Sequence, residues 1–120
     1  MPAILGVVPR RVRILSRSTV KLMASDQLGP RIPIAATPGG AVPGASGYTF
    51  GLGVAVRPAD GLNTVPGSAG DFYWGGYAGT GMWIDPKEEF VGVFMVQSAG
   101  ALRLQHRNLI RQLAYQAIAD

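Results

Sequence analysis

The pattern of apolar and polar positions predicts a short helix near the start of the chain. Ser16 suits a helix N-cap, and the apolar residues that follow it recur at helical spacing. A Gly-Pro dipeptide at residues 29–30 ends this pattern, so we predict a helix over residues 17–27. Residues 29–47 show no sustained period and are rich in glycine and proline, which predicts an irregular loop.

A two-residue period then predicts strands in the second half of the chain. In YTFGLGVAV, residues 48–56, bulky side chains alternate with small ones, which predicts one strand with a large face and a small face. The next strand is DFYWGG, residues 71–76. Residues 81–84 and 90–97 flank an Asp-Pro-Lys-Glu sequence that suits a type I turn, so we predict an antiparallel hairpin.

The remaining apolar positions indicate how helices cover this sheet. The strand FVGVFMV is apolar at every position except its glycine, which predicts that helices cover both faces of the sheet. Residues 102–118 have the period of a helix, whose apolar stripe we expect to pack on the sheet: Leu102, Leu109, Leu113 and Ala117. A second face, which we expect to be solvated, holds Arg103, Arg107 and Arg111.

Together these elements predict an α+β fold. We expect an antiparallel sheet of about three to four strands, with a short N-terminal helix and a long C-terminal helix packed on it. The chain has 120 residues, of which 48% are hydrophobic and 15% are charged. This length and composition are typical of a single globular unit.

The composition excludes several kinds of chemistry. The chain has no cysteine and a single histidine, His106, so we predict no disulfide, no metal site and no cofactor. His106 falls on the polar side of the C-terminal helix, where we expect it to be exposed. The net charge of +4 includes the arginine stripe of that helix, but no aromatic residues interleave with it, so we expect no nucleic acid partner.

No targeting segment is evident. In MPAILGVVPRR the short apolar run precedes the basic residues, whereas a secretory signal places positive charge first. No apolar run approaches the roughly 20 residues that span a bilayer, so we expect no membrane span. These features indicate the cytoplasm by default and leave the compartment of a longer parent protein open.

A candidate catalytic pair lies in the predicted first helix. Ser18 and Lys21 have the Ser-x-x-Lys spacing of serine acyl-transfer enzymes, which brings the amine and the hydroxyl to one helix face. A serine at this position also suits a helix start, and the spacing recurs by chance. The glycine-rich stretch GGYAGTG lacks the order of a phosphate-binding loop, and no Gly-x-Ser-x-Gly elbow exists in the chain.

Three stretches give the chain a family resemblance. WGGYAGTGMWIDPKEEFVGVFMVQ, together with the upstream GYTFGLGVAV and ILSRSTVKLMASDQL, resembles the C-terminal part of the serine β-lactamase-related family. That family includes class C β-lactamases, D-alanyl-D-alanine peptidases and related esterases. The resemblance covers about residues 12–118, which makes 12–120 the C-terminal portion of such a domain and 1–11 an unmatched extension.

The resemblance implies a partial β-lactamase/transpeptidase-like fold without its nucleophile. In the family, the catalytic Ser-x-x-Lys lies far upstream of this segment, and a Tyr-x-Asn motif, absent here, lies between the two. Ser18 and Lys21 then match the family only as part of a short helix, and their spacing is coincidental. We therefore expect this chain alone to be inactive, although the complete enzyme is a serine hydrolase.

The resemblance also assigns a substrate-binding strand. The family's third motif, usually Lys-Thr-Gly or His-Thr-Gly, falls on Trp74, Gly75 and Gly76, and the next backbone N–H, that of Tyr77, belongs to the oxyanion hole. A tryptophan in place of lysine removes a cation that attracts a substrate carboxylate, which favours a neutral ester or amide. The structural alternative is that Trp74 is only a large sheet residue and that the glycines permit close packing.

A different class of function stays open from the sequence. A fragment without the rest of its domain exposes sheet edges and apolar faces. The chain could therefore be a non-catalytic module that binds a peptide or partner chain through a sheet edge. The same surfaces favour self-association or contact with a missing N-terminal portion.

Overall fold

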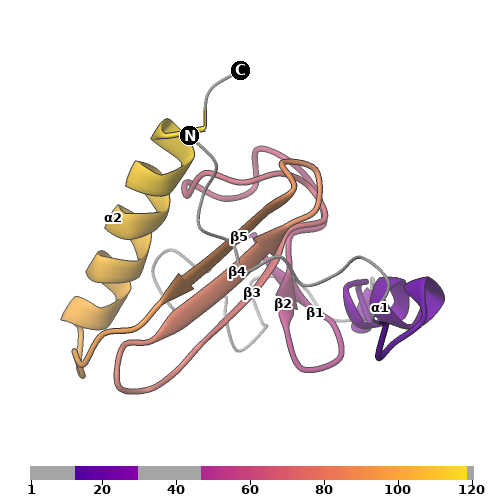
Figure 1. Ribbon diagram of the computed structural model, residues 1–120, viewed down its shortest axis with the longest axis horizontal. Coiled ribbons are helices and arrows are strands. Elements are labelled where there is room, and N and C mark those ends of the chain that lie inside the picture. Colours follow the sequence, from indigo (N-terminus) through magenta and orange to yellow (C-terminus); the bar gives the residue numbers. More distant parts are fainter. Residues whose placement is uncertain (1–12, 30–46, 119–120) are drawn as a thin grey trace.

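The chain forms one helix, then the strands of a sheet, and then a second helix. The computed structural model describes residues 13–29 and 47–118, so most of the predicted loop and the unmatched extension lie outside it. The predicted α+β class is confirmed (Figure 1). The elements are α1 (Arg17–Met23), β1 (Thr49–Phe50), β2 (Ala55–Val56), β3 (Phe72–Gly75), β4 (Gly81–Asp85), β5 (Phe90–Phe94) and α2 (Leu102–Gln116).

The five strands form one antiparallel sheet in chain order, β1-β2-β3-β4-β5. Each strand pairs with the next along the chain, so every connection is local. α2 packs against the sheet beside β5, whereas α1 lies beyond β1 at the opposite end (Figure 1). In this arrangement β1 and β5 are the two edge strands.

The sheet has more strands than predicted, because residues 48–56 form two strands instead of one. Gly51 donates its N–H to the carbonyl of Val54 at 2.8 Å, and Gly53 between them has a φ of +84°. The chain therefore reverses at this point and pairs β1 with β2. The glycines that suggested the small face of one strand form a tight turn, because glycine reaches positive φ at little cost.

The first helix begins as predicted and ends earlier. The Ser16 side chain accepts a hydrogen bond from the N–H of Thr19 at 3.1 Å and so caps α1. The helix ends at Met23 instead of residue 27. Beyond it, the Asp26 carboxylate accepts from the N–H of Leu28 and Gly29, which is a local turn that competes with helix.

The predicted hairpin forms, and its turn is fixed by a buried carboxylate. Asp85, fully buried, accepts from the N–H of Lys87 and Glu88 within the turn. It also accepts from the N–H of Ser68 and from the Tyr115 hydroxyl on α2, at 3.0 and 2.7 Å. Burial raises the pKa of this carboxyl, but the hydrogen bonds from Tyr115 and the backbone outweigh burial, and the pKa of Asp85 is lowered.

We expect Tyr115→Phe to lower the free energy of unfolding by an amount that depends on pH. A carboxyl with a lowered pKa stabilises the folded state above its unfolded pKa of about 3.9, and this contribution is lost as the pH falls through the folded pKa. At pH near 7, losing the hydroxyl should lower the free energy of unfolding by about 1.5–3 kcal/mol. In acid, the difference in the free energy of unfolding between the wild type and the variant should become smaller. Urea denaturation at several pH values measures this difference.

The matched control for this prediction is Tyr77→Phe, because the Tyr77 side chain is exposed. It should change the free energy of unfolding by less than about 0.5 kcal/mol at every pH. A loss in Tyr115→Phe that is the same at neutral and acid pH would contradict the role of the ionised Asp85.

The C-terminal helix forms where predicted but with its faces reversed. The four residues expected to pack on the sheet are all exposed: Leu102, Leu109, Leu113 and Ala117. Arg111, expected to be solvated, is only 6% exposed. The physical reason is that acidic and carbonyl acceptors on the sheet side hold the arginines, so α2 turns its basic face inward.

A buried charged cluster joins α2 to the sheet. Arg57 and Arg111 both contact the same Asp71 oxygen, Oδ2, at 2.8 and 2.6 Å, and all three side chains are buried. The Tyr48 hydroxyl donates to the other Asp71 oxygen at 2.7 Å and accepts from Arg57 at 2.9 Å. Burial strongly raises the pKa of Tyr48, which stays protonated and able to donate.

The sheet face opposite α2 is not covered by a described helix, which contradicts the prediction that helices cover both faces. The strand register places six apolar side chains on this face: Phe72, Trp74, Met82, Ile84, Val91 and Val93. Val91 is 50% exposed and Val93 is 66% exposed. We call these six residues the open face.

Candidate functional site

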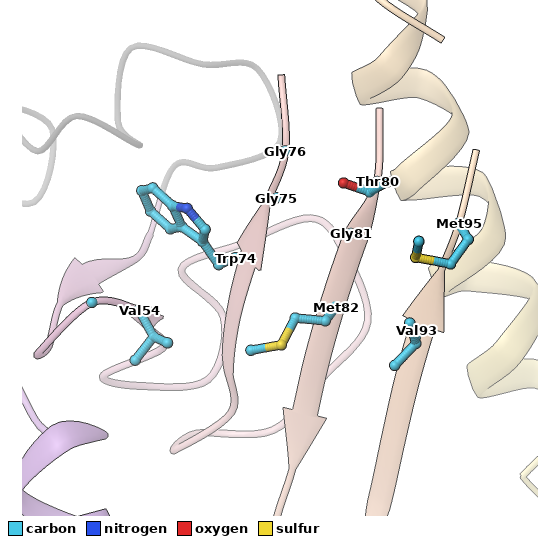
Figure 2. A pocket seen from close by; sticks show the side chains of 10 residues that line it. Val54, Trp74, Gly75, Gly76, Thr80, Gly81, Met82, Val93 and Met95 are labelled. Atoms are coloured by element: carbon cyan, nitrogen blue, oxygen red, sulfur yellow. The ribbon is translucent and has the colours of Figure 1, made fainter. Parts of the chain in front are cut away.

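A shallow apolar hollow lies on the open face where β3, β4 and β5 come together. Its volume is about 390 Å³, and much of it is open to solvent. Figure 2 shows its side chains standing on neighbouring strands. The hollow is lined by Val54, Trp74, Thr80, Met82, Val93 and Met95, together with glycines of the adjoining strands and turns.

Trp74, one of the predicted substrate-binding residues, forms one wall of this hollow. It pairs across the sheet with Met82, so both side chains stand on the open face. Its ring meets Phe50 of β1 edge to face, with centroids 5.4 Å apart, and its side chain is still 47% exposed. Trp74 is thus held by one aromatic contact and presents its remaining surface to the hollow (Figure 2).

The two predicted glycines make room for other groups. A Cβ on Gly75 would lie 2.6 Å from the Arg107 guanidinium carbon, and one on Gly76 would collide with the Thr80 hydroxyl. The structural alternative considered for this motif, close packing, therefore holds for both glycines. It is compatible with a substrate-binding role, because the packed group, Arg107, holds the backbone of the motif.

Arg107 reaches from α2 to the turn between β3 and β4. Its guanidinium donates to the carbonyl oxygens of Gly76 and Thr80, and more weakly to that of Gly79. Burial lowers the pKa of Arg107, and the nearby charge of Arg103 lowers it further. In the described ranges, 13–29 and 47–118, no carboxylate pairs with this guanidinium, so its positive charge acts on the turn carbonyls.

The hydrogen bonds of Gly76 set the direction of the Tyr77 amide. The Gly76 carbonyl accepts from Arg107 and from the N–H of Gly79. In a trans peptide the C=O and the following N–H point in opposite directions, so the N–H of Tyr77 points away from Arg107. A cation on the carbonyl also polarises the peptide, which makes this N–H a stronger donor.

The outer edge of β3 is open beside this amide. β2 pairs with β3 only at Phe72 and Tyr73, so no described strand lies beside Trp74 and Gly75 on that side. The Tyr77 ring is 80% exposed and stacks with Arg103, whose guanidinium carbon lies 4.8 Å from the ring centroid. A strand edge, an outward amide and an apolar hollow thus meet at one end of the sheet.

The structure places Ser18 and Lys21 on α1, at the other end of the molecule from α2 (Figure 1). The Ser18 hydroxyl contacts that of Ser16 at 2.8 Å, within the group that caps the helix. Both Ser18 and Lys21 are exposed. No hydrogen bond joins them among those found in the described part of the chain, and this arrangement suits a helix start.

Sequence reasoning missed Arg107, which it placed on a solvated helix face. The signal that could have found it is the pair of glycines at the end of β3, Gly75 and Gly76, because a strand end with two glycines leaves space for a long side chain from a neighbouring helix. His106, expected to be exposed, is partly buried.

Two features of the described residues bear on other functions. No group of three or more metal-ligating side chains occurs in the part of the chain that the structure describes. None of the helices there is long and apolar enough to cross a membrane.

No protein-family model matches the chain, and a search of curated proteins finds no relative. The resemblance to the β-lactamase-related family therefore rests on the sequence motifs themselves.

Proposed function

We propose that this chain is the C-terminal segment of an esterase-like serine hydrolase of the β-lactamase-related family. Trp74, Gly75 and Gly76 form a wall of its substrate cleft, and the Tyr77 N–H donates to the oxyanion. The observation that carries the proposal is the Gly76 carbonyl, whose bond to Arg107 turns the Tyr77 N–H outward beside the apolar hollow. Such a preorganised donor stabilises the charge that develops on an attacked carbonyl oxygen.

The hollow supports a neutral, apolar substrate. Its side chains are apolar except for the Thr80 hydroxyl and the indole N–H of Trp74. The motif holds no lysine to bind a substrate carboxylate, and Arg107 on the opposite side is occupied by backbone carbonyls. An ester or amide with an apolar acyl group therefore fits this wall better than an anionic β-lactam does.

The chemistry of acyl transfer needs groups from another part of the protein. An oxyanion donor contributes only when a nucleophile generates the oxyanion, and a serine nucleophile needs a base within hydrogen-bond reach. Neither a Tyr-x-Asn motif nor a family-type nucleophile occurs in this sequence. The upstream portion of a longer form would supply the Ser-x-x-Lys and Tyr-x-Asn residues, and this chain alone would not turn over substrate.

Labelling with a fluorophosphonate tests the proposal. We expect the purified chain to show no adduct by intact mass, and a longer form that carries an upstream Ser-x-x-Lys to be labelled under the same conditions on that serine. An adduct on Ser18 that disappears in Lys21→Ala would overturn the proposal, because the nucleophile would then lie within this chain. A longer form without a reactive serine would overturn it as well.

The open edge of β3 favours one second candidate, a non-catalytic module that binds an extended partner chain. Beyond Tyr73 the outer side of β3 has no described strand beside it, and an added strand gains main-chain hydrogen bonds at such an edge. Two results together would favour this candidate over the hydrolase. The Gly75 and Tyr77 amides would exchange slowly in a complex with an extended partner chain, and a longer form would not be labelled by the fluorophosphonate.

A further inference from the structure

The open face is a continuous apolar surface on one side of the sheet. Its six residues come from three neighbouring strands, and Met95, 78% exposed, extends it past the end of β5. None of these seven residues is charged or polar except for the indole N–H of Trp74. The largest apolar patch on a monomeric protein is often a functional surface.

The size of this surface is sufficient for a weak dimer. Trp74, Val91, Val93 and Met95 are 47–78% exposed and supply most of this surface, whereas Phe72, Met82 and Ile84 are partly buried. The open face with Met95 therefore presents at most roughly 600 Å², the upper end of the largest patches on typical monomers. Two copies in contact would bury at most about 1,200 Å² in total, the lower end of specific interfaces.

The charge distribution permits two copies to meet at this face. The chain carries a net charge of +4, but the arginines of α2 lie on the opposite side of the sheet. Packed sheets lie about 10 Å apart, so the arginine layers of two copies would be separated by roughly 20 Å. This distance exceeds the Debye length of about 8 Å at physiological salt, and Asp71 pairs with the buried Arg57 and Arg111.

We propose that two copies of this chain pack face to face through their open faces and form a two-fold symmetric dimer. Sheets packed in this way cross at about 30°, and the same residues of both copies meet at the axis. Val93, Met82 and Trp74 would form the centre of the contact and cover the hollow. The inference concerns the chain by itself and goes beyond the proposed hydrolase function, since it requires no catalytic group.

The exposed leucines of α2 are the competing surface. Leu102, Leu109 and Leu113 form a single narrow stripe, and the exposed glutamines of the helix flank it. A contact between two α2 helices would also bring their arginines closer together than a contact through the open faces. Both the width of the surface and the charges therefore favour the open face.

Sedimentation equilibrium or light scattering across a micromolar to near-millimolar range tests the dimer. We expect the wild-type mass to rise from 12.6 kDa to twice that value and then stop. Val93→Asp buries a carboxylate in the contact and should raise the dissociation constant at least about tenfold. Leu113→Asp, at a position on α2 that is 51% exposed against 66% for Val93, is the matched control and should leave the dissociation constant unchanged.

Three results would overturn the dimer. They are a monomer at every concentration, dissociation by Leu113→Asp but not by Val93→Asp, and a mass that keeps growing, as edge-to-edge strand pairing would give. Circular dichroism of both variants checks that they are folded. None of these results bears on fluorophosphonate labelling of a longer form, so the two proposals can fail separately.

Discussion

Asp71→Asn is expected to lower the free energy of unfolding by about 3–5 kcal/mol, because it leaves two buried guanidinium groups without a counter-charge. Arg57 and Arg111 both lie against the Asp71 carboxylate, which is completely buried. An asparagine keeps the shape and one acceptor but removes the charge. A small domain has a total stability of about 5–15 kcal/mol, so the loss is a large part of the whole. Urea denaturation followed by circular dichroism measures it.

The control for this cluster is Asp60→Asn. Asp60 is exposed and accepts one hydrogen bond, from the N–H of Ala69 at 2.7 Å, which an asparagine oxygen also accepts. It should change the free energy of unfolding by less than about 0.5 kcal/mol. If Asp71→Asn cost no more than Asp60→Asn, the buried ion pairs would contribute little to the fold. A variant Asp71→Asn that fails to fold at all would agree with the expected loss only if Asp60→Asn folds normally.

Tyr77→Pro is expected to lower kcat of a longer, active form by about 10²–10³-fold, which corresponds to about 2.7–4 kcal/mol. Proline has no backbone N–H, so this substitution removes the proposed oxyanion donor together with the exposed ring. Among the described residues the Tyr77 N–H donates no hydrogen bond within the chain, so the change breaks none. Initial rates with a nitrophenyl ester of a short fatty acid, over a range of substrate concentrations, separate kcat from KM.

The matched control is Tyr77→Ala, which keeps the N–H and removes the exposed ring. It should retain kcat within a few-fold. If Tyr77→Ala lost as much activity as Tyr77→Pro, the side chain and not the amide would carry the effect. Equal activity of Tyr77→Pro and the unaltered protein would remove Tyr77 from the oxyanion hole.

The sequence predicted the elements of the fold well where local patterns decide them. The Ser16 cap and the turn after β4 depend on residues within a few positions of each other, and both form as predicted. The prediction of one strand over residues 48–56 was wrong. Alternation of large and small residues fits both a single strand and two short strands joined by a glycine turn. The positive φ of Gly53 and the Gly51–Val54 hydrogen bond distinguish these two, and the alternation of residue sizes indicates neither.

The orientation of α2 could not be predicted from its own residues. A helical pattern places leucine inside and arginine outside when the neighbouring surface is apolar. Here Asp71, 40 positions from Arg111 in sequence, lies on the sheet and holds that arginine inside. Because Asp71 is distant along the chain, the local helical period does not indicate that Arg111 has a buried partner.

In the candidate site, too, local motifs could be read from the sequence and contacts between distant residues could not. Trp74, Gly75, Gly76 and Tyr77 could be proposed from the sequence because they are consecutive and resemble a motif. Arg107 lies about 30 positions later and contacts them only through backbone carbonyls. Every residue has a backbone carbonyl, so the sequence does not show which carbonyls accept hydrogen bonds. A residue that binds a motif through carbonyls can therefore be identified only from the structure.

The two tryptophans of this chain lie on opposite faces of one sheet. Trp83 faces α2, rests on Gly92 of the next strand and is 6% exposed, whereas Trp74 stands in the hollow. A buried indole emits at shorter wavelength than one in contact with water, and a dissolved ion such as iodide quenches only the second. The protein therefore has an intrinsic fluorophore on each face, so that occupancy of the hollow and loosening of the interior change different parts of one emission spectrum.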